Sequence, residues 1–411
     1  MKEHTTSKVP QIRFKGFEDG WLEDQLEERV EFFSGLTYSP RNVQKGVGTL
    51  VLRSSNVKNG EIVNADNVYV DPKIVNSKYV EVGDIAVVVR NGSRSLIGKH
   101  AQIKNRMDNT VIGAFMTGIH SENPTFTNAL LDTPQFDKEI AKNLGATINQ
   151  ITTGAFRQMM FRFPRRTEQT QIGEYFRELD RLIGLHQRKH DKLVKLKKAM
   201  LQKMFPQPGA TTPEIRFKGF SEAWKEKELG ELVNFFKGKG LSKSEIDPSG
   251  TEPCIHYGQL FTEYSEVISN VISRAKGGNS YFRSIANDVL MPTSDVTPRG
   301  LAKASAINES DVIIGGDILV IRGDKKLLLG SFLSRYIRYM ESQVLQMVSG
   351  STVFHLYSSS MEKFRVKYPS VSEQQKIGSY FRTLDKLISK HASQLQKLKQ
   401  IKSACLEKMF V

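Results

Sequence analysis

The sequence contains little cysteine and no long hydrophobic run. Only Cys254 and Cys405 occur in 411 residues, and they form no CxxC pair, so a disulfide scaffold and a zinc ribbon are excluded. The longest apolar run, residues 85–89, has the length of a strand, whereas a membrane-spanning helix requires about 18 apolar residues. The first residues include no apolar signal region. We therefore expect a cytoplasmic protein with no membrane partner.

Motifs for the common nucleotide and hydrolytic chemistries are missing as well. There is no Pro-Pro pair, which the Asn/Asp-Pro-Pro-aromatic motif of adenine methyltransferases requires. The nearest match to a phosphate-binding Gly-x4-Gly-Lys-Ser/Thr loop, residues 92–99, is one residue too long and is followed by His100. HExxH, GxSxG and clustered metal ligands do not occur. We predict no catalytic residue, no metal site and no cofactor bound by this chain.

Positive charge, in contrast, is in excess. Lys and Arg number 59 against 44 Asp and Glu, which gives a net charge of +15. Such an excess favours a polyanionic partner. Part of the charge lies in residues 188–198, where it can equally form the solvated face of a helix.

A long segment with helical periodicity occurs twice, at an offset of 205 residues. Residues 168–205 match residues 373–410, and neither copy contains an interior proline. The matched length indicates an internal duplication. Both copies carry an apolar heptad seam, which is kept over about five heptads. The seam consists of Ile172, Phe176, Leu179, Ile183, His186 and Leu193 in the first copy and of Ile377, Phe381, Leu384, Ile388, His391 and Leu398 in the second.

A helix with one apolar stripe needs a partner that covers the stripe. The other copy is the simplest partner, so we predict an intramolecular antiparallel coiled coil. Ser372 begins a capping box with Gln375, and Thr167 is the matching cap of the first copy. We interpret His186 and His391 as a polar pair that sets the register of the coil, with a metal or pH role as the alternative.

The duplication extends beyond the helices. Residues 10–17, followed by Trp21, match residues 213–220, followed by Trp224, and we expect both tryptophans to anchor cores. Between the matched parts, short β-type runs are broken by Gly, Asn, Asp and Pro and mixed with probable helices, which predicts an α/β globule in each half. The predicted domains are a first globule at 1–166, a first long helix at 167–206, a linker at 207–212, a second globule at 213–371 and a second long helix at 372–411.

This organisation resembles the specificity subunit of type I restriction–modification enzymes. The resemblance rests on the duplication, the Phe-Lys-Gly-Phe…Trp entries, the Gly-Ser-Thr…Pro…Ser-Glu-Gln-Gln exits and the Ile-Gly…Phe…Leu-Asp…Ile helices. It implies that each globule is a target-recognition domain for one half of a split, asymmetric double-stranded DNA sequence. It also implies that the helices form a spacer that docks two methyltransferase subunits, and that restriction and motor subunits join. S-adenosylmethionine, ATP and Mg would then be bound by those partner subunits, and this chain would not be an enzyme.

Polar and basic residues in glycine-broken loops after strands are the best candidates for DNA contact, because base edges and phosphates are bound by such side chains. Arg94 and Arg299 are the strongest single candidates. The predicted DNA-binding residues are Arg90, Asn91, Ser93, Arg94, Lys99, Thr147, Asn149 and Gln150 in the first half and Ser294, Thr297, Arg299, Lys303, Thr352 and His355 in the second.

Two other functions fit the same sequence features. One is a free-standing DNA-binding protein that uses the same coiled coil. The other is the specificity chain of a different restriction–modification class, with catalysis on a neighbouring chain.

Overall fold

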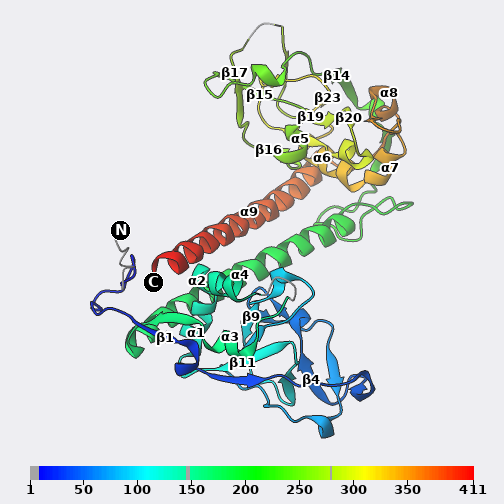
Figure 1. Cartoon of the computed structure of the whole chain (residues 1–411). Helices are drawn as coiled ribbons and strands as arrows, with labels where there is room; N and C mark the ends of the chain where they lie inside the picture. Colours follow the sequence, from blue (N-terminus) through cyan, green and yellow to red (C-terminus); the bar gives the residue numbers. More distant parts are fainter. Residues whose placement is uncertain (1–8, 145–148, 278–279) are drawn as a thin grey trace. The chain divides into compact units, whose positions relative to one another are not determined.

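A computed structural model describes residues 9–144, 149–277 and 280–411 (Figure 1). The chain divides into two compact units. Unit 1 runs to Arg188 and includes His391–Val411, and unit 2 is Lys189–Lys390. The two long helices, α4 (Arg166–Met204) and α9 (Val371–Lys408), each contribute one portion to each unit. Each unit is therefore a mixed α/β globule with segments of both helices, so the predicted fold class is confirmed.

Unit 1 is built on short, mostly antiparallel strands. Its central sheet has the order β2-β11-β8-β9, in which β8 is buried along its whole length. A second sheet has the order β10-β4-β7-β3, and β10 and β4 are parallel. The strands of these sheets are β2 (Glu31–Ser34), β3 (Val43–Gln44), β4 (Thr49–Leu52), β7 (Val68–Val70), β8 (Ile85–Val88), β9 (His100–Gln102), β10 (Thr110–Ile112) and β11 (Met116–His120).

The remaining elements of unit 1 include two small ribbons and three short α-helices. Two small ribbons are β1 (Leu22–Gln25) with β12 (Met160–Phe163) and β5 (Val57–Lys58) with β6 (Glu61–Ile62). The helices are α1 (Pro124–Leu131), α2 (Pro134–Asn143) and α3 (Thr153–Arg157). Gly173 of α4 lies against the first turn of α1, where an added Cβ would come within 2.6 Å of the Phe126 nitrogen. The Ile-Gly step of the helix therefore allows this close approach.

Unit 2 repeats the plan with different lengths. Its central sheet has the order β14-β23-β19-β21-β16, a second sheet has the order β17-β15-β22-β18, and two ribbons pair β13 with β25 and β20 with β24. The strands are β13 (Lys225–Glu228), β14 (Val233–Lys237), β15 (Glu252–Ile255), β16 (Val267–Ile268), β17 (Ser273–Ala275), β18 (Phe282–Arg283), β19 (Val289–Pro292), β20 (Ser294–Asp295), β21 (Ser305–Ile307), β22 (Ile313–Ile314), β23 (Ile318–Gly323), β24 (Phe354–His355) and β25 (Arg365–Tyr368). The helices are α5 (Gln259–Thr262), α6 (Gly330–Tyr339), α7 (Glu341–Leu345) and α8 (Ser358–Met361).

The long helices begin one residue before the predicted caps. Thr167 and Ser372 therefore lie in the first helical turn and are not the cap residues. The side chain of Gln374, which is fully buried, donates to the Pro369 carbonyl at 2.9 Å, and Gln169 donates to Pro164 at the same distance. These amides bind the chain that enters each helix. The residues that precede the helices are Arg165 and Ser370, so the sequence match to a capping box placed both caps two residues too late.

The segments that begin the two repeats bind the first turns of the long helices. Arg13 forms a two-pronged ion pair with Glu168 at 2.7 and 2.8 Å, and Arg216 forms the same pair with Glu373. Both glutamates are buried, so each guanidinium satisfies a carboxylate that water does not reach. The hydrogen bond to the glutamate is the largest effect on the pKa of Arg13 and of Arg216, and it raises both pKa values.

The helix segments pair antiparallel inside each unit. In unit 1, Asp180 and Lys402 form an ion pair at 2.6 Å, and the Nδ1 atoms of His186 and His391 lie 3.0 Å apart. In unit 2, Lys197 and Asp385 form an ion pair at 2.7 Å. The structure thus places the two seam histidines against each other. One ring must donate and the other accept, because two Nδ1 protons would face each other otherwise.

Seam residues near the helix starts are buried and later ones are half-buried. The starts lie inside the core clusters of the globules, whereas Leu193 and Leu398 pack at the edges of those clusters. The buried members are Ile172, Phe176, Leu179, Ile377, Phe381 and Leu384, and the half-buried members are Ile183, His186, Leu193, Ile388, His391 and Leu398.

Each core is completed by the end of the helix that belongs to the other repeat. Trp21 is 3% exposed and contacts the ring of Phe410 with a centroid distance of 6.0 Å. Trp224 is 4% exposed and contacts the ring of Phe205 at 6.1 Å. The tryptophans are core residues, as predicted, and each packs on a phenylalanine that follows a long helix.

Candidate nucleic-acid interface

Two separately predicted loops meet in unit 1. The segment after β8 reaches the segment after residue 148, where Arg90 and Gln150 form an antiparallel bridge. The Asn91 nitrogen donates to the Asn149 carbonyl at 3.2 Å, and the Asn149 side chain donates to the Gly92 carbonyl at 3.0 Å. We call residues 90–94 with 149–150 the first loop pair. Thr147, also predicted to bind DNA, lies outside the described residues.

Several predicted contact residues of this pair hold the loop itself. The Asn91 side chain donates to the Ser54 hydroxyl at 2.9 Å and accepts from the Ser93 nitrogen at 3.0 Å, an arrangement typical of tight turns. The Ser93 hydroxyl lies 2.9 Å from that of Ser95. Lys99 is half-buried, whereas Arg94 is exposed. Asn91 and Asn149 thus shape the loop, and Arg94 is available to a ligand.

The second loop pair has the same position in unit 2. It consists of residues 294–299, which follow β19, and residues 352–355, with Ser294 opposite His355 in the β20–β24 ribbon. The Thr297 hydroxyl donates to Asp295 at 2.7 Å. Arg299 is exposed, and its Nε lies 3.9 Å from a Glu341 carboxylate oxygen, while Thr352 is exposed at the edge of the ribbon.

Lys303 lies next to this pair but is engaged within unit 2. Its ammonium donates to the Phe261 carbonyl at 2.9 Å and sits 5.5 Å from the centre of the Phe261 ring. A lysine fixed in this way holds the 3-10 turn at residues 298–302 and has less freedom to reach a phosphate.

The two loop pairs are equivalent in position and different in chemistry. Each follows a buried central strand and is closed by the segment that leads to the last strand before a long helix. The first presents arginines and an amide. The second presents hydroxyls, one arginine and a histidine. The two loop pairs thus have the same position and different hydrogen-bonding groups. They can therefore bind two different polar ligands of the same class.

An apolar groove adjoins the first loop pair. It has a volume of about 640 Å³, and its walls include Leu36, Tyr38, Val43, Val68, Phe115 and Met116. The ring of Phe115 is 56% exposed and lies under the Arg90 guanidinium, 4.9 Å from its carbon. Sequence reasoning missed Phe115 because the residue stands in a run that reads as a buried strand, and its exposure depends on the turn before β11.

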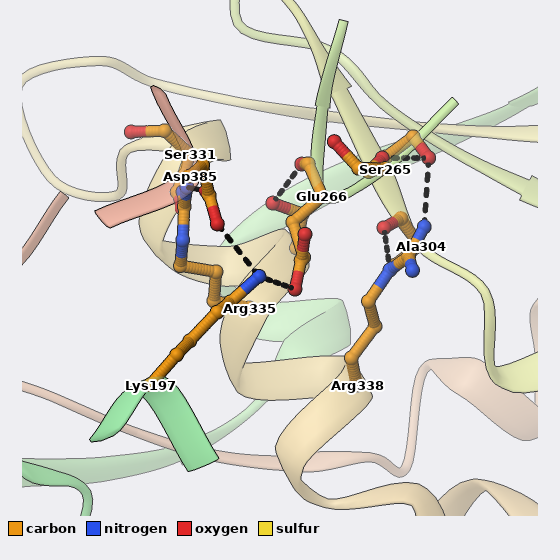
Figure 2. A network of polar contacts seen from close by, with 10 residues as sticks. Lys197, Ser265, Glu266, Ala304, Ser331, Arg335, Arg338 and Asp385 are labelled. Carbon is orange, nitrogen blue, oxygen red and sulfur yellow. Dashed lines mark hydrogen bonds and ion pairs between the residues drawn. The ribbon is translucent and has the colours of Figure 1, made fainter. Parts of the chain in front are cut away.

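A lysine near the end of each long helix anchors the helix to the globule of the same unit. In unit 2, Lys197 binds Glu266 at 2.8 Å and Asp385 at 2.7 Å, and Arg335 binds the same Asp385 at 2.8 Å (Figure 2). In unit 1, the equivalent Lys402 binds Asp132 at 2.7 Å and Asp180 at 2.6 Å.

The charge in residues 188–198 could equally form a solvated helix face, but Lys197 does not lie on one, since only 18% of its side chain is exposed. The helix aspartates, Asp180 and Asp385, occupy equivalent positions of the duplication, whereas the globule acids Asp132 and Glu266 do not. The globule acids that bind the two equivalent lysines, Lys197 and Lys402, therefore come from different places in their globules.

The unit 1 anchor contains a buried histidine. His100 lies 3.3 Å from Asp132 and also contacts the Gly98 carbonyl at 3.0 Å. Burial alone would raise the pKa of Asp132, but the hydrogen bond from His100, the charge of His100 and the charge of Lys402 outweigh burial and lower that pKa to about 2. Burial would lower the pKa of His100, yet the bond to Asp132 and its charge raise it. The pKa of Asp132 is thus lowered and that of His100 is raised, so the carboxylate and the ring each favour the charged form of the other.

Two negative findings bear on the class of protein. Among residues 9–144, 149–277 and 280–411, no group of three or more His, Cys, Asp or Glu side chains could hold a metal ion. In the same part of the chain, no helix has the length and apolar character needed to cross a membrane.

A family model matches part of the chain. Residues 221–400 match the model of the type I restriction modification DNA specificity domain. This match covers unit 2 from its first strand and most of α9, so the resemblance predicted from the sequence is confirmed.

Individual relatives match over larger parts of the chain at low identity. The type I restriction enzyme StySPI specificity subunit of Salmonella potsdam is 23% identical over 243 residues, which are 56% of this chain and 52% of that protein. The putative type I restriction enzyme MjaX specificity subunit of Methanocaldococcus jannaschii is 22% identical over 276 residues, 64% of this chain and 61% of that protein. The matches thus span little more than half the length of these relatives.

The fold has a solved counterpart over its whole length. The crystal structure of the type I restriction-modification system S subunit from M. genitalium superposes with a TM-score of 0.68 at 16% identity, covering 98% of this chain and 99% of that one. Two globules with long helices are therefore an arrangement that this chain shares with that protein.

Proposed function

We propose that this chain is the DNA specificity subunit of a type I restriction–modification complex and that it reads a bipartite, asymmetric target in double-stranded DNA. The observation that supports this most directly is the presence of two equivalent loop pairs with different side chains. Base edges in the major groove differ in their donors and acceptors, so surfaces with different polar groups select different sequences. Unit 1 would read one half-site and unit 2 the other.

The charge of the chain agrees with a DNA ligand. The net charge of +15 suits a phosphate backbone, which supplies much of the affinity of DNA-binding proteins. Arg94 and Arg299 are exposed at corresponding places in the loop pairs. Each can bind either a guanine edge through two hydrogen bonds or a phosphate.

In this proposal the helices dock two methyltransferase subunits, and restriction and motor subunits join the assembly. Exposed apolar side chains support docking on the helices, because α4 exposes Val194 and Leu196 and α9 exposes Leu387 and Ile401. S-adenosylmethionine, ATP and Mg would be bound by the partner subunits, and this chain would position them without catalysing a reaction.

Genome-wide mapping of methylated adenines tests the proposal in cells that produce the chain with its methyltransferase partner. We expect one split, asymmetric target. Replacing residues 39–150 with the equivalent segment of a relative should change one half-site and leave the other half-site and the gap unchanged. A methylation pattern independent of this chain, or a swap that alters both half-sites, would contradict the proposal.

A further inference from the structure

The apolar groove beside the first loop pair is suited to a ligand with an apolar edge next to a polyanion. Among the described residues that line it, the charged ones are Arg53 and Asp66, and these two neutralise each other in an ion pair of 2.6 Å. The remaining lining is mostly aliphatic and aromatic. No unpaired acid in the described lining would repel a phosphate backbone.

Another groove of unit 1 has the opposite character. It has a volume of about 710 Å³, and five acids line it: Asp19, Glu27, Glu28, Glu31 and Glu122. Three arginines, Arg29, Arg165 and Arg166, also line it. A surface with more acids than bases disfavours DNA. Of these two grooves of the globule, the apolar one is therefore compatible with the proposed ligand.

The apolar groove is physically continuous with the first loop pair. Ser54, which lines the groove, accepts a hydrogen bond from Asn91. Phe115 also lines the groove, and the guanidinium carbon of Arg90 lies over its ring, 4.9 Å from the ring centre. Stacking on an aromatic ring fixes the plane of a guanidinium. A base bound by the loop pair would thus lie within reach of Ala114 and Phe115, both of which are exposed.

We infer that Ala114 and Phe115 read a thymine in the first half-site by packing against its 5-methyl group. The inference rests on the proposed DNA-binding function. The methyl group is the apolar feature that distinguishes thymine in the major groove, and alanine and phenylalanine side chains are suited to contact it. The groove behind Phe115 accepts the methyl group away from water, and Arg90 lies over the same ring to meet a neighbouring base or phosphate.

Unit 2 differs at the corresponding position. Phe115 directly precedes β11, and the residue that directly precedes the equivalent strand β23 is Asp317, an exposed acid. Asp317 forms an ion pair with Lys237 at 3.7 Å, and its carboxylate does not offer the apolar surface that a methyl group needs. The thymine contact therefore belongs to the first half-site alone.

The test uses the full complex with its methyltransferase partner and a duplex that carries the mapped target. The first half-site is the half that changes when residues 39–150 are exchanged. Each thymine of that half-site is replaced in turn by deoxyuridine, which removes only the methyl group. At one position we expect about fourfold weaker binding, the equivalent of about 0.8 kcal/mol for one buried methyl group. In the Phe115→Ala variant, which keeps Ala114, the effect of the same replacement should fall well below fourfold.

Val296→Ala is the matched control, because Val296 is an exposed apolar residue in the second loop pair. It should leave the deoxyuridine response of the first half-site unchanged. The inference is overturned if no thymine position responds, or if the response keeps its full size in Phe115→Ala because that variant weakens thymine and deoxyuridine duplexes equally. The absence of any sequence-specific binding by the wild-type complex would instead refute the proposed function.

Discussion

Lengthening both long helices at the boundary between the units should lengthen the gap of the DNA target. We consider a four-residue insertion after Arg188 in α4 together with one after Lys390 in α9. The boundary matters because unit 1 ends at Arg188 and resumes at His391, so every anchor and core contact described above stays within its own unit. An insertion between Val194 and Lys195 would instead divide the unit 2 portion of α4, where Leu193 packs on the same core as Met204.

The size of the effect follows from helix and DNA geometry. Four residues add about 6 Å to an α-helix and turn it about 40° beyond a full turn. DNA rises about 3.4 Å per base pair and turns about 35° per base pair. The rotation corresponds to one base pair and the translation to nearly two, and tilt of the helices against the DNA shortens the translation. The heptad seam tolerates the insertion, because a stutter of four residues unwinds a coiled coil only locally.

Methylated sites mapped genome-wide in a strain that carries the double insertion provide the readout. We expect both half-sites unchanged and a gap longer by about one base pair. The insertion in α4 alone is the control, and it should reduce activity because the opposite helix has no matching residues. Full activity of the double insertion with an unchanged gap would refute the idea that the helices set the spacing.

Three further predictions concern single residues. Phe410→Ala should destabilise unit 1 by about 3–5 kcal/mol, because the ring is buried among other aromatic rings. A thermal or denaturant melt in which unit 1 keeps its wild-type midpoint would contradict this. The pKa of Asp132 is about 2 when folded and 3.8 when unfolded, so its contribution of about 2 kcal/mol is present above pH 4 and is lost as the pH falls to 2. Denaturant unfolding between pH 2 and 5 should show this loss in the wild type and not in Asp132→Asn. Arg94→Ala and Arg299→Ala should each cost about 1–3 kcal/mol and relax one base position if the guanidinium binds guanine, or reduce the salt dependence of binding by about one phosphate if it does not. Unchanged affinity and salt dependence in both variants would reject these residues as DNA contacts.

The helices and their register were predictable because the duplication and the heptad spacing can both be recognised in the sequence itself. His186 and His391 occupy equivalent seam positions and were predicted to form a polar pair that sets the register, and the structure shows that contact. The position of the loop pairs was predictable for a similar reason, because loops that follow buried strands recur at matching places in both halves. The two loops of each half were expected separately, however, and their contact through Arg90 and Gln150 depends on the tertiary fold.

Side-chain partners that come from distant segments could not be predicted. Lys197 stands in a run of lysines that has the composition of a solvated helix face, and nothing local reveals that two acids surround its ammonium. The clamp between Arg13 and Glu168 joins residues 155 positions apart. Phe115 shows the converse case, since a residue in an apolar run is exposed by the turn in which it lies. Pattern determines which elements form, whereas long-range contacts decide which polar groups remain available to a ligand.

The backbone hydrogen bond that spans the linker between the repeats has an equivalent between residues 12 and 408. The Ile215 nitrogen donates to the Lys203 carbonyl at 2.9 Å, on either side of the linker at 207–212. The Ile12 nitrogen donates to the Lys408 carbonyl at 3.0 Å in the same way, although no peptide bond joins those segments. The end of each long helix is therefore bound in the same way to the segment that begins a repeat. A chain opened within 207–212 and joined from Val411 to the segment before Ile12 would keep every contact described for both units.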